Sequence, residues 1–198
     1  QGMSSMQDLL LRLDLPADSW SGRIKLLLIG VVFTVLTQSS SAGVAAVLTA
    51  LFTESITLAQ GLSLVIGMDV GTTVTAVLAT IGGSAQVRRT GYSHFVYNVM
   101  TAAGAFLLLL PYVHFWERYA PQQIGENAEL ILVGFHTAFN VAGVLLVLPF
   151  TTQFARLMVK LVPERADGYT TALDTALHVD PAMALTALSV TTRQEFAA

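Results

Sequence analysis

The chain has 198 residues, of which 54% are apolar and 12% are charged, whereas about 25% of the residues of an average soluble domain are charged. The net charge is −3 and there is no cysteine, which excludes disulfides, thiolate catalysis and cysteine metal sites. The sequence also has no basic patch and no nucleic-acid-binding motif, so we expect no DNA or RNA partner. This composition predicts a membrane protein.

The first segment, residues 1–23, is expected to be the end of an earlier helix followed by a polar loop, because Asp14 and Pro16 interrupt any regular pattern. Its first 15 residues lack the basic and apolar regions of a signal peptide, and the sequence does not start with Met. We therefore expect that the natural chain begins earlier and that this sequence is a C-terminal part of it.

Four apolar stretches follow, and each is long enough to cross a bilayer. The hydrocarbon core is about 30 Å thick and takes roughly 20 helical residues. The stretches cover residues 24–52, 56–82, 91–113 and 130–150. We predict an all-α membrane protein with a transmembrane repeat over residues 24–150.

The stretch 24–52 has a polar centre at Thr37–Ser41, followed by Gly43. Such a centre favours a turn, so the stretch is either a re-entrant hairpin with its tip at Gln38–Ser41 or one long spanning helix. Small hydroxyl residues can simply join helices. A phosphate dianion in a dry site, however, needs many donors, and hydroxyls, an amide and free N–H groups at a helix start supply them. The adjacent glutamine and a second polar break favour this phosphate site.

That second break lies in the stretch 56–82, at Gly67–Thr75. The glycines Gly67 and Gly71 predict a broken helix with exposed carbonyls, although they could also be a close-packing motif. Asp69 and the threonines add oxygen ligands suited to sodium. A charge at the bilayer centre costs at least about 2.5–3.5 kcal/mol, and a bound cation would offset it, which favours an ion site.

The charge of Asp69 also suggests how sodium and phosphate are coupled. At about 6 Å from a phosphate dianion, with an effective dielectric constant of 20, repulsion is roughly 5–6 kcal/mol. Phosphate would then bind poorly unless the carboxylate were protonated or bound to a cation. We therefore hypothesise that sodium loads at or near Asp69 before phosphate.

The stretches 91–113 and 130–150 are predicted to be ordinary spanning helices. Each contains a histidine and an asparagine four residues apart, on one helical face: His94 with Asn98, and His136 with Asn140. No carboxylate or cysteine completes a metal site in either pair, so interhelical hydrogen bonding is the better interpretation. The intervening loop carries aromatic residues suited to the membrane interface, namely Tyr112, Trp116 and Tyr119.

Basic residues set the expected orientation. Arg88 and Arg89 precede the third stretch and Arg156 and Lys160 follow the fourth, so the positive-inside rule places both clusters in the cytoplasm. The tail, residues 151–198, is then cytoplasmic. Within it Asp180-Pro181 predicts a helix start, with Asp as N-cap and Pro at the first helical position.

Several motifs together resemble the type II sodium–phosphate cotransporters. They are TQSSSA at 37–42, GMDVGTTVTA at 67–76, RR at 88–89, SHFVYN at 93–98, FHTAFN at 135–140 and HVDPAMAL at 178–185. The resemblance implies a broken-helix, re-entrant-hairpin transporter repeat in the bacterial inner membrane. It also implies that the tail is the start of a cytoplasmic helical region like the phosphate-regulation protein PhoU.

The resemblance further implies two ion sites. Phosphate would bind Gln38, Ser39, Ser40, Ser41, Thr72 and Thr73, and sodium would bind Thr37, Gln38, Asp69, Gly71, Thr72 and Thr75. Two departures from the family pattern stand out. Asp69 replaces the usual asparagine, and the sequence has one QSSS where family members have two. The other half of the site must come from an N-terminal repeat or from a second copy.

We therefore expect a sodium-driven importer of inorganic phosphate that works by alternating access around a midplane site. It would perform no covalent chemistry and need no cofactor. Its partners would be phosphate, sodium and the lipid bilayer. The alternative, from another class, is a membrane-embedded phosphate or sodium sensor that signals through its tail without transport.

Overall fold

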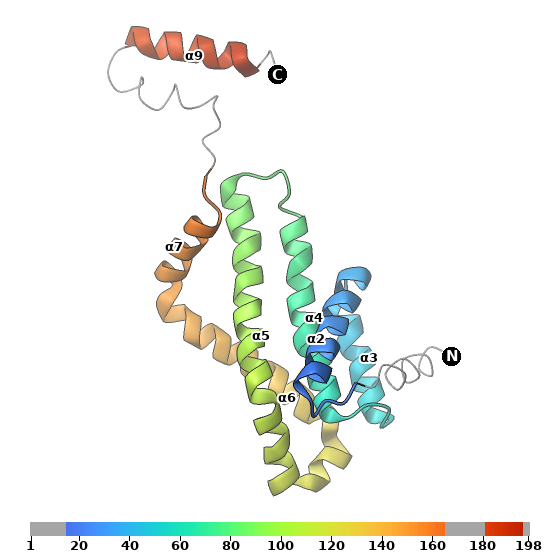
Figure 1. The fold of residues 1–198 in the computed structure, drawn as a ribbon. Helices are drawn as coiled ribbons and strands as arrows, with labels where there is room; N and C mark the ends of the chain where they lie inside the picture. Colours follow the sequence, from blue (N-terminus) through green and yellow to red (C-terminus); the bar gives the residue numbers. More distant parts are fainter. Residues whose placement is uncertain (1–14, 165–180, 196–198) are drawn as a thin grey trace. The chain divides into compact units, whose positions relative to one another are not determined.

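The computed structural model describes residues 15–164 and 181–195. Within these ranges the regular structure is entirely helical, and the chain divides into two units, Gln1–Lys160 and Leu161–Ala198. Four helical segments are long and apolar enough to cross a membrane, which confirms the predicted all-α membrane fold. The helices are α2 (Trp20–Thr37), α3 (Ser40–Phe52), α4 (Leu58–Leu78), α5 (Ala85–Tyr119), α6 (Pro121–Val147), η1 (Leu148–Phe150), α7 (Thr151–Leu161) and α9 (Pro181–Glu195) (Figure 1).

The stretch 24–52 forms two helices, because the chain turns at Gln38 and Ser39. Gln38 adopts a left-handed backbone conformation (φ 55°) that ends α2, and the Ser39 hydroxyl accepts a hydrogen bond from the backbone N–H of Ala42 at the start of α3. α3 then runs back along α2 (Figure 1). Of the two alternatives open from sequence, the single spanning helix is therefore wrong. A location of the turn inside the bilayer stays a prediction.

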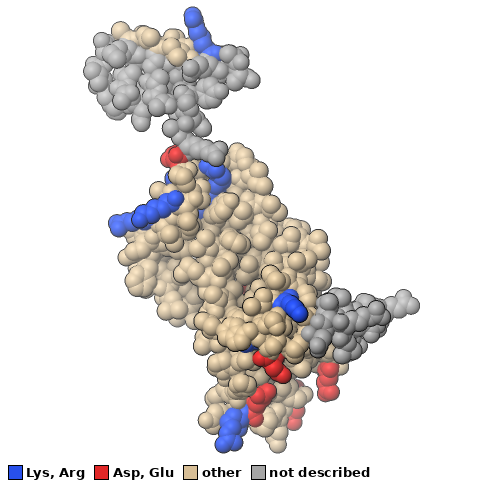
Figure 2. Space-filling view, in the orientation of Figure 1, with Lys and Arg blue, Asp and Glu red and all other residues tan. Residues whose placement is uncertain are grey.

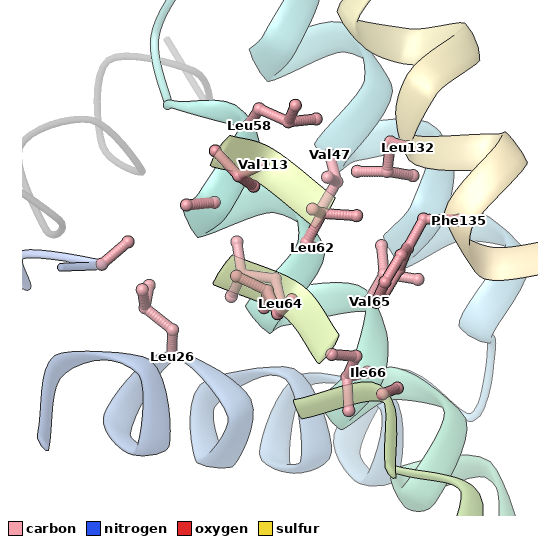
Figure 3. Close-up of a cluster of buried hydrophobic side chains, with 14 of the residues drawn as sticks. Leu26, Val47, Leu58, Leu62, Leu64, Val65, Ile66, Val113, Leu132 and Phe135 are labelled. Carbon is pink, nitrogen blue, oxygen red and sulfur yellow. The ribbon is translucent and has the colours of Figure 1, made fainter. Parts of the chain in front are cut away.

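α4 is the centre of the first unit. A capping box at its start, in which Thr57 and Gln60 exchange hydrogen bonds, fixes where it begins. Its first three turns are buried almost all round, which is typical of a helix surrounded by others. Apolar side chains from four neighbouring helices converge on it in Figure 3: Leu26 of α2, Val47 of α3, Val113 of α5, and Leu132 and Phe135 of α6.

The predicted break in α4 is absent, and the helix continues through Gly67 and Gly71. These glycines instead let α2 approach. A Cβ at Gly67 would overlap the backbone oxygen of Leu27, and a Cβ at Gly71 would lie 2.7 Å from that of Val31. The prediction of a broken helix here was wrong. The two glycines allow close packing of α2 against α4, which was the alternative interpretation of the pattern.

The last two spans are longer than predicted. α5 has 35 residues and continues through Pro111, so it is about 52 Å long at about 1.5 Å per residue. The expected loop around Trp116 is helical, and Ala120 alone separates α5 from α6, which begins at Pro121. α6 is kinked at Asn127, whose backbone is not helical. Proline at the first position of α6 favours this compact connection.

Charged side chains are segregated in the first unit. On the face shown in Figure 2, the acidic ones gather at the end where α5 meets α6, and the surface between this end and the opposite one is largely uncharged. A cavity at the acidic end is lined by Asp18, Glu54, Glu117, Glu126 and Glu129, among others. The opposite end carries Arg88 and Arg89 near the start of α5. An uncharged belt between two charged ends is what a bilayer requires.

One charged side chain is buried near the start of α2. Arg23 is 2% exposed, and its guanidinium carbon lies 4.7 Å from the ring centroid of Trp20 and 5.0 Å from that of Phe106. Cation–π contacts of this kind are stronger when desolvated. They join α2 to the middle of α5.

The second unit contains α9, which begins at Pro181 as the sequence predicted. Its predicted N-cap, Asp180, lies outside the described residues. Residues 165–180, between α7 and α9, lie outside them too, and the PhoU-like tail stays a prediction.

Candidate functional site

The start of α3 lies at the level of the polar segment of α4, residues Gly67–Thr75. A Cβ at Gly43 would lie 2.8 Å from the Met68 sulfur, while Gly61 faces Val47 and Leu51. The two helices are therefore antiparallel, and residues before Gly43 lie further along α4 than Met68. Ser40, three residues before Gly43, falls near the level of Thr72.

At the turn between α2 and α3, several polar side chains form hydrogen bonds with nearby backbone groups. The Thr37 hydroxyl donates to the Phe33 carbonyl oxygen (2.8 Å), and the Gln38 amide donates to the carbonyl oxygen of Val35. The Ser39 hydroxyl caps α3. The Ser40 and Ser41 hydroxyls have no hydrogen bond within the described chain, and Ser41 is exposed. These two hydroxyls are therefore free to bind a ligand.

Thr72 points into the space between α3 and α6. Successive helical residues differ by about 100° around the axis, so Thr72 lies between the direction of Met68, which faces α3, and that of Asp69, which faces α6. Its side chain is exposed, although its hydroxyl donates to the Met68 carbonyl oxygen (2.9 Å). This placement leaves Thr72 able to turn its hydroxyl towards a ligand beside the start of α3.

Two other proposed ligands on α4 are not brought into this space. Thr73 is fully buried and its hydroxyl donates to the Val70 carbonyl oxygen (2.6 Å). Gly71 is buried against α2 within continuous helix, so the exposed carbonyl expected for sodium is absent there. Thr75 is half-buried on the same helix.

Asp69 lies in a polar cluster between α4 and α6. The Nε2 atom of His136 lies 3.1 Å from Oδ1 and 3.0 Å from Oδ2 of the Asp69 carboxylate. The Asn140 amide donates to Oδ2 as well (3.2 Å). The Asp69 side chain is 18% exposed and that of His136 is 30% exposed. An ionised carboxylate only accepts, so Nε2 of His136 must carry a hydrogen.

Asn140 also connects this cluster to α5. Its backbone oxygen accepts a hydrogen bond from the hydroxyl of Tyr97 (3.4 Å), and its amide donates to the His136 carbonyl oxygen (3.0 Å). Asn140 therefore touches polar groups of α4, α5 and its own helix. The three spanning helices therefore meet at this one residue, through its side chain and its backbone oxygen.

The second histidine–asparagine pair is different. The Asn98 amide donates to the His94 carbonyl oxygen (3.3 Å) within α5, and His94 is exposed. Among the described residues no group of three His, Cys, Asp or Glu side chains could hold a metal ion. The two pairs match in sequence spacing, but only His136 and Asn140 meet a carboxylate.

The sequence interpretation missed this cluster. It held that no carboxylate completes the His136 pair, and that a cation would offset the charge of Asp69. Asp69 is that carboxylate, and two protein donors offset part of its charge. A usable signal was present, because a lone carboxylate in one span needs a partner, and polar residues in mid-span are few.

Comparison with known proteins decides the family. The family model described as Na+/Pi-cotransporter matches residues 4–139. The chain belongs to the Na+/Pi-cotransporter family. This confirms the resemblance drawn from the motifs, and together with the four apolar helices it identifies an integral membrane protein.

Two curated relatives of this Na+/Pi-cotransporter family member are bacterial. "Uncharacterized protein YqeW" of Bacillus subtilis is 35% identical over 147 residues, which cover 74% of this chain and 45% of the relative. "Putative inorganic phosphate export protein YjbB" of Escherichia coli is 30% identical over 158 residues, covering 77% of this chain and 27% of the relative. The chain thus spans less than half the length of either relative. No solved structure matches it.

Proposed function

We propose that this protein takes part in sodium-coupled transport of inorganic phosphate. Phosphate binds at the start of α3, and sodium binds at the carboxylate of Asp69 on α4. The observation that carries the proposal is the placement of these two polar groups in adjacent helices of a Na+/Pi-cotransporter family member. The E. coli relative YjbB is named for phosphate export, which favours the same anion. Net direction follows the ion gradients.

The start of α3 suits an oxyanion. The hydroxyls of Ser40 and Ser41 are free, and the backbone N–H groups at a helix N-terminus point outward and favour negative charge. Gln38 and Ser39 are within the same turn, and Thr72 is near the same level on α4. Neutral donors of this kind bind a dianion less tightly than a fixed positive charge would. Release therefore stays fast enough for transport.

Asp69 suits sodium because a hard cation prefers oxygen ligands. Its carboxylate is the one acidic group in the polar segment Gly67–Thr75 of α4, and it is partly exposed. Without a cation it would repel phosphate by roughly 5–6 kcal/mol at about 6 Å and an effective dielectric constant of 20. Sodium loading removes most of that repulsion, which couples the two ions.

The second half of the site comes from elsewhere, because this sequence contains one QSSS. An N-terminal repeat or a second copy of this chain would supply it. Reconstitution at low and high protein density separates the two. If a second copy is needed, uptake per molecule rises with density. If a preceding repeat is needed, only a longer natural chain is active.

The decisive experiment is uptake of radiolabelled phosphate into proteoliposomes. An inward sodium gradient is compared with a potassium gradient of equal size. We expect faster uptake with sodium, and a loss of the difference when a sodium ionophore dissipates the gradient. Uptake that does not depend on sodium would contradict the coupling. Phosphate binding without any uptake, also in a longer natural chain, would contradict transport and point to a sensor.

A further inference from the structure

The imidazole of His136 lies where a cation would bind Asp69. Its Nε2 atom is almost equidistant from the two carboxylate oxygens, at 3.1 and 3.0 Å. A cation held by both oxygens of a carboxylate occupies that same position in the fork. Asn140 takes a further acceptor position on Oδ2. The remaining free side of the carboxylate offers a cation only one oxygen, Oδ1.

We infer that His136 competes with sodium for Asp69 and thereby sets the sodium affinity of the site. This inference rests on the proposed function, because it concerns the same carboxylate. Sodium can bind both oxygens only after the imidazole has moved away. His136 thus lowers the affinity for sodium by occupying the ion's place.

The competition lowers the net affinity of Asp69 for sodium. A transported ion must bind well enough to enter and weakly enough to leave. A bare carboxylate at membrane depth would hold a cation tightly, because the low dielectric strengthens the attraction. The hydrogen bond from His136 is regained when sodium leaves, which lowers the net affinity and speeds release.

The competition also links ion binding to the contact between two helices. Asp69 is on α4 and His136 is on α6. Sodium therefore exchanges an interhelical hydrogen bond for an ion contact on α4 alone. Asn140 keeps its own bond to Oδ2 unless the carboxylate rotates. Sodium loading should thus loosen α6 from α4 at this level.

The test compares His136→Phe and His136→Gln with the parent in the full chain. Phenylalanine keeps a ring among the neighbouring aromatic residues Phe135 and Phe139 but has no donor. We expect a half-saturating sodium concentration about tenfold lower, which corresponds to about 1.4 kcal/mol. Glutamine retains a donor, so we expect a smaller shift in the same direction. Sodium titrations of phosphate uptake and of the melting temperature provide two readouts.

His94→Phe is the matched control. His94 is also followed four residues later by an asparagine, but the described contacts of this pair stay within α5, so its sodium titration should equal that of the parent. An unchanged or higher half-saturating concentration in both His136 variants overturns the inference. A parent whose uptake ignores sodium overturns the proposed coupling instead, and the melting-temperature titration still tests whether sodium binds.

A spectroscopic measurement on the parent avoids any loss of folding in variants. The chain has four histidines, so nitrogen-15 labelling of histidine gives few signals. We expect one imidazole to change its shift when sodium, but not potassium, is added, and that signal to be missing from His136→Gln. If sodium changes the melting temperature while every histidine signal stays unchanged, sodium binds without displacing His136 and the inference is wrong.

Discussion

His136 on α6 contacts both carboxylate oxygens of Asp69 on α4, 67 residues earlier in the chain, at 3.0 and 3.1 Å. The pair explains how a carboxylate can persist in a segment that enters the membrane. A charge at the bilayer centre costs at least about 2.5–3.5 kcal/mol, and hydrogen bonds to a charged group contribute about 1.5–3 kcal/mol each. The donors on His136 and Asn140 therefore contribute a free energy comparable with that lower bound.

Replacing Asp69 with Asn tests the sodium site directly. The change keeps the shape of the side chain and removes its negative charge. We expect the half-saturating sodium concentration for phosphate uptake to rise at least about tenfold, because a neutral amide attracts a cation far less than a carboxylate does at low dielectric. Sodium titrations of the mutant and the parent that superimpose would show that Asp69 is not part of the coupling.

Gly67→Ala tests the close contact between α2 and α4. A Cβ there would overlap the backbone oxygen of Leu27, and a backbone atom cannot move aside as a flexible side chain can. We expect the free energy of unfolding to fall by about 1–3 kcal/mol, the usual effect of overpacking. The measurement is the melting temperature in detergent, which should be lower.

Gly104→Ala is the control for that change. A Cβ at Gly104 in α5 meets nothing within 4 Å, and alanine favours a helix over glycine by about 0.5–1 kcal/mol. The control should be neutral or slightly stabilised. If both variants melt alike, the contact between α2 and α4 is looser than the structure indicates.

The two glycines in α4 show what a sequence can and cannot decide. Glycine permits either a bent backbone or a close neighbour, and both uses produce the same residue in the same place. The choice depends on whether the α2 backbone lies against Gly67 and Gly71, which is a long-range fact. The turn at Gln38, in contrast, was predictable because polar residues and a glycine follow one another locally.

The sequence indicated that Asp69 needs a polar partner, but it could not decide which histidine–asparagine pair supplies it, for a related reason. His94 with Asn98 and His136 with Asn140 are equivalent by sequence, and both lie in spanning segments. Only the packing of α6 against α4 brings His136 to the carboxylate. Residue types thus revealed that a polar site exists, while its geometry depended on contacts between distant segments.

Ser40→Ala combined with Ser41→Ala tests the phosphate site. Both hydroxyls are free in the structure, and each hydrogen bond to an anion contributes about 1.5–3 kcal/mol. We expect the half-saturating phosphate concentration to rise about tenfold or more, with a smaller change in the sodium titration. Thr49→Ala on the same helix is the control, because its hydroxyl donates to the carbonyl oxygen of Ala45 (2.9 Å). Equal phosphate titrations for the double variant and the parent would exclude this turn from the site.

Asn140→Ala tests whether the polar cluster joins the spanning helices. The change removes the donor to Oδ2 of Asp69 and the donor to the His136 carbonyl oxygen. We expect a lower melting temperature equivalent to about 1.5–3 kcal/mol, the worth of a hydrogen bond to a charged group. Asn98→Ala removes the same kind of bond to a histidine carbonyl without a carboxylate, so the difference between the two variants isolates the contribution of Asp69.

A double-mutant cycle between Asn140→Ala and His136→Phe completes this test. Both side chains donate to one carboxylate, so their effects on stability should be coupled by about 0.5–3 kcal/mol, as for residues in one hydrogen-bond network. The expected sign follows from the geometry. After one donor is lost, the carboxylate is already poorly satisfied and draws in water. The double variant should therefore lose less stability than the sum of the losses of the two single variants. Strict additivity would mean that the two donors act on different carboxylate environments, contrary to their shared contact at Oδ2.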